Sequence, residues 1–129
     1  MGYSRREIGR LGEHIGKKYL RQKGYELIES NYHKSWGEVD IIARGTQGET
    51  VFFEVKTRTN LSFGQPEESI GRSKQIKLIK TMDSYLNENP VLFNTEYRID
   101  VLSIMLNFKE KMARIKHIKN AVEDLDFEY

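Results

Sequence analysis

The run VFFEVK at residues 51–56 places a carboxylate, Glu54, and an ammonium, Lys56, among apolar residues. Side chains alternate across a strand, so both charges share one face with Phe52 and Arg58, while the other face is a conventional apolar core. Burying a charge costs several kcal/mol unless the charge is paired or coordinated. The run therefore indicates that a neighbouring group compensates the two charges.

A hairpin brings a second carboxylate to this strand. The segment 45–49 predicts a turn, so Arg44 faces Thr50, and counting back along both strands places Asp40 opposite Glu54. Directly opposed residues have Cβ atoms about 4.5–5.5 Å apart, where two like charges destabilise the sheet. One acid is then expected to hold a proton, or a cation to lie between the two. The expectation depends on this register, because a slip of one residue would move Asp40 to the other face.

A helix is expected to supply a third acid. A capping box and apolar residues at helical spacing predict a helix within 4–24. Gly9, Gly12 and Gly16 flank its apolar stripe, and each costs a helix interior up to about 1 kcal/mol relative to alanine. Close approach to a packing partner is the expected compensation. Glu13 projects from this glycine-bearing flank.

Three carboxylates, Asp40, Glu54 and Glu13, would form a site of hard oxygen ligands. Mg²⁺ or Mn²⁺ suits such ligands, and Mg²⁺ typically uses one or two carboxylates together with water and substrate phosphate. A protonated lysine is no ligand, but Lys56 could orient or deprotonate an attacking water, or stabilise charge on a phosphate. The combination predicts metal-assisted hydrolysis of a phosphodiester.

The elements that must position these residues alternate between helix and strand patterns. Beyond the first helix, the patterns predict strands over 25–32, 38–44, 50–58, 96–106 and 112–118, a long helix over 72–88, a polar loop over 60–66 with a helical turn near 67–70, and an acidic tail over 120–129. The order α-β-β-β-α-β-β predicts a mixed α/β sheet with a helix against each face, or with both on one face.

Length and composition predict one cytoplasmic domain. The 129 residues suit a single core, and no apolar run is long enough for a membrane span or a signal peptide. The absence of cysteine excludes disulfides and thiolate zinc sites. A net charge of only +2 excludes a general polycation, so nucleic-acid affinity would come from local clusters such as 72–80 and 109–119. A solvated face is the alternative interpretation of each cluster.

The combination of Asp40, Glu54-Val55-Lys56 and Glu13 resembles the PD-(D/E)xK nuclease superfamily. A longer pattern, spanning residues 5–121, is similar to the bacterial YraN family, also called UPF0102, which comprises predicted endonucleases distantly similar to archaeal Holliday-junction resolvases. The pattern consists of Gly12-Glu13, Gly24-Tyr25, Asn31-Tyr32, Gly37-Glu38-Val39-Asp40, Phe53-Glu54-Val55-Lys56-Thr57-Arg58, Phe63-Gly64, Lys74-Gln75, Tyr85-Leu86 and Arg98-Ile99-Asp100-Val101.

The resemblance implies a restriction-endonuclease-like fold, a three-layer α-β-α core in a single domain over 1–121 followed by an acidic tail over 122–129. It implies metal ligation by Asp40 and Glu54, to which we add the Val55 carbonyl. The resemblance also implies that Lys56 is the catalytic lysine and that Glu13 is the supporting acid on the first helix.

A polar residue on the second long helix also approaches the site in the resolvase-like branch. Gln75 or Lys74 matches that residue, and we expect Gln75 in a catalytic role and Lys74 in contact with nucleic acid. One position departs from the superfamily pattern, since Val39 replaces the nominal proline before Asp40. That proline is commonly absent in the superfamily.

Several other residues keep two interpretations. Arg58 is a phosphate clamp or a salt-bridge partner. Trp36 lies in a basic loop, where it could stack on bases or pack against the protein. Asp100 is expected to form a structural ion pair with Arg98. None of the three histidines has ligand spacing.

The sequence thus predicts a Mg²⁺- or Mn²⁺-dependent endonuclease acting on DNA, with branched or junction DNA among its candidate substrates. A junction substrate would favour a homodimer with two sites. The alternatives are a non-catalytic nucleic-acid-binding module of the same fold, and a protein-interaction subunit with a charged surface.

Overall fold

The computed structural model describes residues 2–59 and 70–122 as two α-helices, a short 3-10 helix and five strands. Their order is α1 (Arg5–Gln22), β1 (Glu26–Lys34), β2 (Gly37–Arg44), β3 (Thr50–Arg58), α2 (Arg72–Glu88), η3 (Pro90–Asn94), β4 (Tyr97–Asn107) and β5 (Met112–Ile118). This confirms the expected order α-β-β-β-α-β-β. The expected loop over 60–66, and most of the turn over 67–70, lie outside the described residues.

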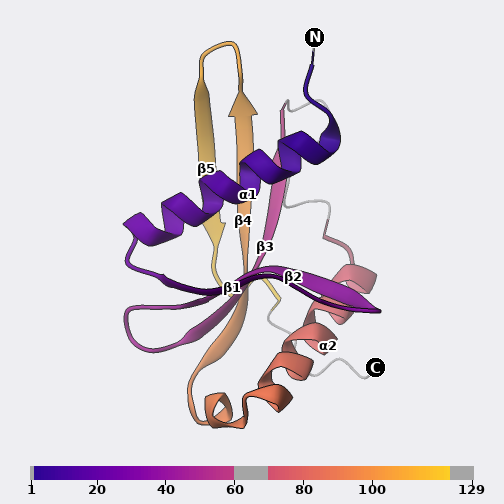
Figure 1. The fold of residues 1–129 in the computed structure, drawn as a ribbon, viewed down its shortest axis with the longest axis vertical. Helices are drawn as coiled ribbons and strands as arrows, with labels where there is room; N and C mark the ends of the chain where they lie inside the picture. Colours follow the sequence, from indigo (N-terminus) through magenta and orange to yellow (C-terminus); the bar gives the residue numbers. More distant parts are fainter. Residues whose placement is uncertain (1, 60–69, 123–129) are drawn as a thin grey trace.

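The five strands form one sheet in the order β1-β2-β3-β4-β5. β3 and β4 are parallel, whereas every other neighbouring pair is antiparallel. Arg44 pairs with Thr50 across the β2–β3 turn, as expected from the length of that turn. Figure 1 shows the β1–β2 hairpin running across the direction of β3, β4 and β5, so the sheet is strongly twisted between its two halves.

One helix covers each face of the sheet, which gives the three-layer α-β-α arrangement (Figure 1). On one face, α2 packs Met82 and Leu86 into a core with Phe52. On the other, α1 packs Leu20 into a core with Phe53. The structure thereby decides between the two arrangements that the order of elements allows. Neither described helix combines the length and apolar character needed to cross a membrane.

Two glycines of α1 lie against the sheet, as expected. A Cβ atom at Gly12 would overlap the side chain of Thr57 on β3, and one at Gly16 would lie 3.3 Å from Leu102 on β4. Gly9, by contrast, has no neighbouring atom within 4 Å of such a position. Close packing therefore accounts for Gly12 and Gly16 but not for Gly9, and it seats the middle of α1 directly on the end of β3.

Two boundaries differ from the expected ones. β1 continues to Lys34, which pairs with Gly37, so only Ser35 and Trp36 remain in the turn. Val122, at which the acidic tail was expected to begin, is only 2% exposed and joins the core beneath α2. The domain therefore extends at least to this residue, and the remainder of the tail lies outside the described residues.

Candidate active site

Glu54 is a buried acid at the middle of β3, with 3% of its surface exposed. Its Oε1 atom forms ion pairs with Lys56 Nζ at 3.5 Å and with Lys74 Nζ at 3.3 Å. Its Oε2 atom is buried without a hydrogen-bond partner in the part of the chain that the structure describes. Most buried carboxylate oxygens are hydrogen-bonded, so this atom marks a position at which a further group could bind.

Asp40 lies where β2 and β3 separate. The pairing of the two strands ends at Ile41 and Phe53, one step before Asp40 would face Glu54. The Val55 N–H donates instead to Asp40 Oδ2 at 2.7 Å. A side-chain carboxylate thus takes the place of the next backbone acceptor, and this satisfies the N–H of β3 beyond the paired region.

The strand alternation of β2 changes at the same point. Ile42 and Val39 both pack in the core beneath α2, whereas Ile41 packs in the core beneath α1. Strict alternation would place Val39 and Ile41 on the same face. Asp40 lies between these two residues, so its carboxylate is directed into the gap between the strands and toward Val55.

Burial and, after it, the neighbouring charge of Glu54 raise the pKa of Asp40 from 3.8 to about 7. The hydrogen bond from Val55 opposes this shift, while the charges of Glu38 and Glu13 add to it. The repulsion between two neighbouring carboxylates is relieved if one of them keeps its proton up to about neutral pH. A cation bound between them would also relieve it.

The backbone of Val55 presents both of its polar groups to this gap. Thr50 N–H donates to the Glu96 carbonyl on the side of β4, and backbone groups alternate in direction along a strand. The N–H and carbonyl of Val55 therefore point toward β2, in agreement with the hydrogen bond to Asp40. The gap thus contains the Asp40 carboxylate and the Val55 carbonyl, with Glu54 on the adjoining position of β3.

The other predicted site residues differ in whether they contact Asp40 or Glu54. Glu13 hydrogen-bonds with Asn31 Nδ2 at 3.0 Å and pairs with Lys17 at 3.5 Å, so it contributes negative charge near Asp40 without a direct contact in the described structure. Lys74 reaches Glu54 from α2. Gln75 instead donates to the Ile70 carbonyl at 3.3 Å, at the start of the same helix.

The donor set fits a small divalent cation. Two carboxylates and a backbone carbonyl are hard oxygen ligands, and Mg²⁺ commonly binds proteins through one or two carboxylates and completes its shell with water and phosphate. The unpartnered Glu54 Oε2 is the structural observation that favours such an ion. Within residues 2–59 and 70–122, no cluster of three or more acidic or histidine side chains is arranged for metal binding. The fit therefore depends on the Val55 carbonyl and on ligands from substrate or water.

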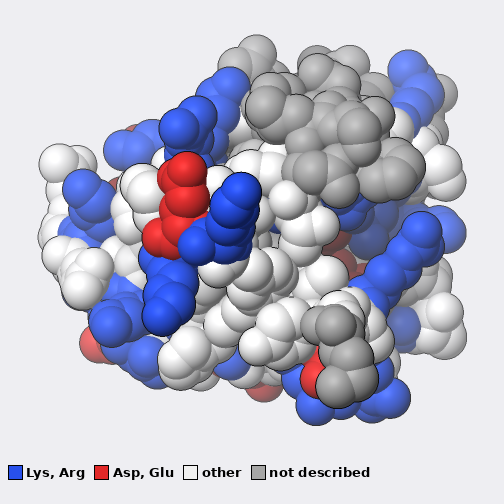
Figure 2. Space-filling view, turned by 90° about the horizontal axis from the view of Figure 1, so that it is seen from above, with Lys and Arg blue, Asp and Glu red and all other residues white. Residues whose placement is uncertain are grey.

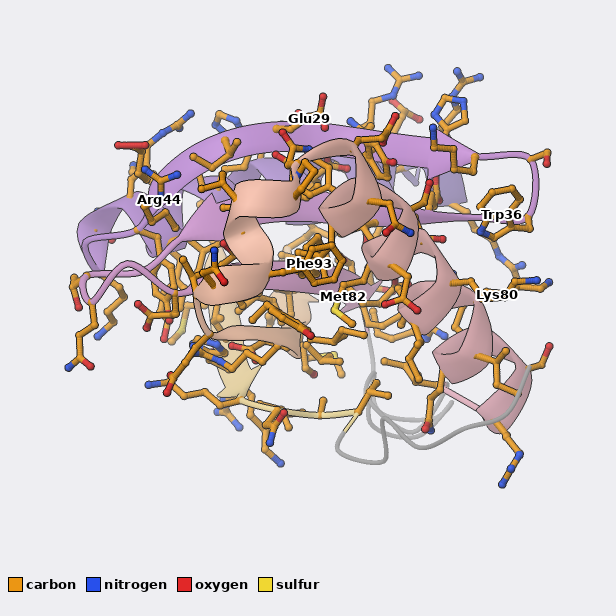
Figure 3. All side chains as sticks on the ribbon, turned by 90° about the horizontal axis from the view of Figure 1, so that it is seen from below. Glu29, Trp36, Arg44, Lys80, Met82 and Phe93 are labelled. Atoms are coloured by element: carbon orange, nitrogen blue, oxygen red, sulfur yellow. The ribbon has the colours of Figure 1, made fainter. Side chains whose placement is uncertain are left out.

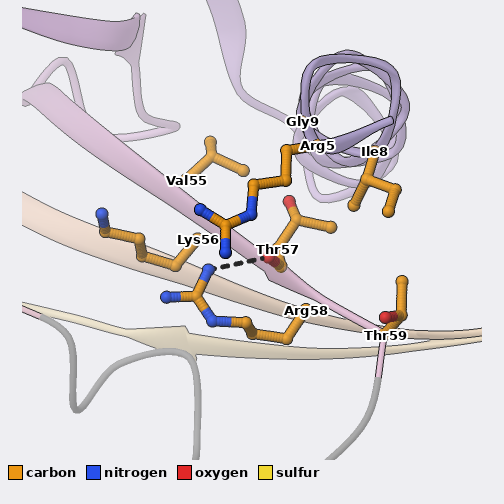
Figure 4. A pocket seen from close by; sticks show the side chains of 8 residues that line it. All are labelled: Arg5, Ile8, Gly9, Val55, Lys56, Thr57, Arg58 and Thr59. Carbon is orange, nitrogen blue, oxygen red and sulfur yellow. Dashed lines mark hydrogen bonds between the residues drawn. The ribbon is translucent and has the colours of Figure 1, made fainter. Parts of the chain in front are cut away.

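A pocket of about 460 Å³ lies beside the site and contains three cationic side chains, Arg5, Lys56 and Arg58. In Figure 4 the guanidinium groups of Arg5 and Arg58 approach one another above β3, and Arg58 donates to the Thr57 carbonyl at 3.1 Å. Converging cations favour an anionic occupant such as phosphate. In the sequence, Arg5 stands out only as part of the basic pair Arg5-Arg6, one of the local clusters that could bind nucleic acid, and nothing local places it beside Arg58.

Basic side chains extend beyond this pocket. On the face seen in Figure 2, which carries the start of α1 and the end of β3, Lys and Arg cover more of the visible surface than Asp and Glu do. A near-neutral chain can therefore present a locally positive surface, which attracts polyanions.

Asp100 belongs to a separate, structural cluster. It accepts hydrogen bonds from Arg98 Nε at 2.9 Å and from the Asn120 backbone at 2.8 Å, and it lies 2.7 Å from His117 Nε2. The expected ion pair with Arg98 is confirmed. These contacts tie β4 to β5 and to the segment after β5, away from Glu54.

Comparison with known sequences identifies the family. Residues 12–104 match the model of "Uncharacterised protein family UPF0102". A UPF0102 protein of Dictyoglomus turgidum is 40% identical over 117 residues, which cover 90% of this chain and 97% of that protein. One from Caldicellulosiruptor saccharolyticus is 40% identical over 119 residues, covering 92% and 98%. The chain therefore belongs to the UPF0102 family, as the residue pattern indicated.

Two solved structures show a distant likeness to this chain. An EndoMS complex with double-stranded DNA aligns with 70% of this chain at 15% identity and a TM-score of 0.39, and the chain spans 33% of that protein. A repair endonuclease from Pyrococcus abyssi aligns with 77% of this chain at 16% identity and a TM-score of 0.36, and the chain spans 37% of it. Similarity at this level says nothing about activity.

Proposed function

We propose that this chain is a divalent-metal-dependent endonuclease that hydrolyses phosphodiester bonds in DNA. The proposal is carried by the neighbouring acids Asp40, which is half-buried, and Glu54, which is buried: one Glu54 oxygen lacks a partner among the described residues, and the pKa of Asp40 is raised to about 7. Acids with a purely structural role are expected to have their buried oxygens satisfied.

Asp40, Glu54 and the Val55 carbonyl would hold the ion. Bound Mg²⁺ or Mn²⁺ would neutralise the acids and polarise the phosphate. The hydrogen bond from Val55 N–H to Asp40 Oδ2, at 2.7 Å, orients the carboxylate in the gap between β2 and β3. Glu13 adds negative charge from α1.

Lys56 is the proposed catalytic lysine. Its Nζ atom lies 3.5 Å from Glu54 Oε1, on the strand face that carries the acid. From there the ammonium can orient an attacking water or stabilise charge on the phosphate. In the reaction the water oxygen bonds to phosphorus, one bridging P–O bond breaks, and the departing oxygen takes up a proton. Arg5 and Arg58 would hold a neighbouring phosphate in the pocket of Figure 4.

The test is cleavage of a panel of labelled DNAs, comprising duplex, single strand, flap and four-way junction, with Mg²⁺ or Mn²⁺. Wild type should nick at least one substrate, and Lys56→Ala and Glu54→Gln should each lower the rate at least about 100-fold, the size expected for loss of one catalytic group. Lys18→Ala, on the exposed side of α1, is the matched control. Cleavage unchanged by both site variants would overturn the proposal.

A second candidate is a nucleic-acid-binding module without catalysis. Its support is that Lys56 and Lys74 already neutralise Glu54 at Oε1 without a metal. Calorimetric titration with Mn²⁺ separates the two functions. The nuclease requires an ion whose binding is lost in Asp40→Asn and Glu54→Gln, whereas the module binds DNA equally well in the presence of EDTA.

A further inference from the structure

We propose that Trp36 and the basic groove between the β1–β2 turn and α2 hold an unpaired base, so that the preferred substrate carries a single-stranded DNA segment next to the scissile phosphate. The inference deepens the proposed nuclease function and rests on it for the scissile phosphate. Binding of the unpaired base itself is independent of catalysis.

Trp36 presents part of its ring to solvent. Figure 3 shows it at the tip of the β1–β2 hairpin beside Lys80 on α2. Its residue surface is 40% exposed, and Lys80 Nζ lies 5.8 Å from the ring centroid. A partly exposed indole ring is the type of group on which nucleic-acid bases stack.

The turn that carries Trp36 is held against α2. A Cβ atom at Gly37 would lie 3.0 Å from Thr81 Oγ1, 3.2 Å from Lys77 Cβ and 3.4 Å from the Lys77 carbonyl. The backbone at Gly37 therefore packs tightly against the helix. Because this contact holds the backbone next to Trp36 in place, the turn needs less ordering when a base stacks on the ring, which lowers the entropic cost of stacking.

Three lysines line the groove beside the ring. The groove has a volume of about 390 Å³, and its lining includes Lys34, Lys74 and Lys77 as well as one acid, Glu38. Lys34 is paired with Glu88 and Lys74 with Glu54, each at 3.3 Å, and Lys77 on α2 adds a further positive charge. An aromatic ring beside lysines is an arrangement with which proteins hold single strands, the lysines on phosphates and the ring on a base.

The groove and the candidate active site share Lys74. This lysine lines the groove and also forms the ion pair with Glu54 at 3.3 Å. A strand whose phosphate contacts Lys74 would therefore lie one side chain away from Glu54. Bases inside a duplex are already stacked on both faces, so Trp36 can engage only an end, a flipped base or an unpaired segment. This selects flaps, single strands and branched DNA over continuous duplex.

Trp36 is the only tryptophan in the chain, so its fluorescence reports on this groove alone. The experiment titrates the full chain with a 12-nucleotide oligo(dT) and, separately, with a closed duplex hairpin, in EDTA at low salt. Oligo(dT) is expected to quench the fluorescence in a saturable, salt-sensitive manner, while the hairpin quenches little. By anisotropy of labelled oligo(dT), Trp36→Ala should bind roughly 10-fold more weakly and Trp36→Phe nearly as well as wild type.

The matched control is Phe93→Ala, another exposed aromatic, located on η3 (Figure 3), which should leave oligo(dT) binding unchanged. Melting curves establish that each variant is folded. Equal affinity of Trp36→Ala and wild type for oligo(dT), or saturation without quenching, would overturn the inference even if the protein cleaves DNA. Quenching and selective loss in Trp36→Ala would support it even if no cleavage is found, and this outcome separates it from the nuclease proposal.

Discussion

The carboxylate of Asp40 accepts a hydrogen bond from the backbone N–H of Val55 at 2.7 Å, at the point where β2 and β3 stop pairing. This contact holds one acid of the candidate site in a gap of the sheet next to the buried Glu54. The gap interrupts the hydrogen bonding between β2 and β3, and the charges of the two acids beside it affect stability and metal binding in ways that can be measured.

The first prediction concerns stability and pH in the absence of metal. The folded-state pKa of Asp40, about 7, lies above its ordinary value of 3.8, so the native state retains a proton that the unfolded chain releases. The contribution of Asp40 to stability is therefore complete below about pH 3.8 and is lost as the pH rises through about 7. Asp40→Asn should unfold at the same urea concentration as wild type at pH 4, but be more stable at pH 8 by up to roughly 4 kcal/mol.

The measurement is urea unfolding in EDTA between pH 4 and pH 8. Glu110→Gln, which removes an exposed carboxylate from the β4–β5 turn, should follow wild type throughout. A difference between Asp40→Asn and wild type that does not change with pH would show that Asp40 is not the group that titrates.

A second prediction is that Mn²⁺ stabilises the folded chain. At pH 8 and about 100 times its dissociation constant, a bound ion adds about 2.7 kcal/mol, a rise in Tm of several degrees. Thermal melting should show this rise for wild type, whereas Asp40→Asn and Glu54→Gln should show none. The rise should shrink at pH 5.5, where a proton on Asp40 competes with the ion. An equal rise in Glu54→Gln would contradict a site at this acid.

The third prediction concerns Lys74, whose positive charge stabilises the buried Glu54 and would also repel a cation bound there. Because its ammonium pairs with the buried Glu54, Lys74→Ala should lower stability by roughly 1 kcal/mol, a small value for a side chain 36% exposed. Removing the same positive charge reduces repulsion of a nearby cation, so Mn²⁺ affinity should increase by roughly two- to tenfold. Calorimetry measures the affinity. The neighbouring Lys77→Ala should leave it unchanged, and weaker Mn²⁺ binding in Lys74→Ala would contradict the proposed geometry.

The fourth prediction tests how α1 is seated on β3. A methyl group at Gly12 would overlap Thr57, so Gly12→Ala should destabilise the chain by roughly 1–3 kcal/mol through overpacking. Gly9→Ala meets no neighbouring atom and should instead stabilise the helix by up to about 1 kcal/mol. Urea unfolding of the two variants provides an internal comparison. Equal effects would show that the approach of α1 to β3 is looser than the structure has it.

Much of the fold was readable in the sequence because it depends on local periodicity. The capping box at Ser4 is present with both of its hydrogen bonds, and the apolar alternation of β3 divides the two cores as expected. The length of the β2–β3 turn sufficed to predict that Arg44 pairs with Thr50. The turn after β1 was less predictable, since nothing local indicates that Lys34 and Gly37 continue the ladder.

The sequence was sufficient to predict which acids and which lysine belong to the candidate site, but not how they are arranged. The sequence by itself determined that Glu54 and Lys56 share a strand face and that an acid from β2 comes near them, because strand periodicity and turn length act over a few residues. Only the tertiary structure decided that β2 and β3 part at Asp40, and that α2 brings Lys74 rather than Gln75 to Glu54. Both depend on the twist of the sheet and on where each helix crosses it. These are set by long-range packing of the two cores, which no local pattern encodes.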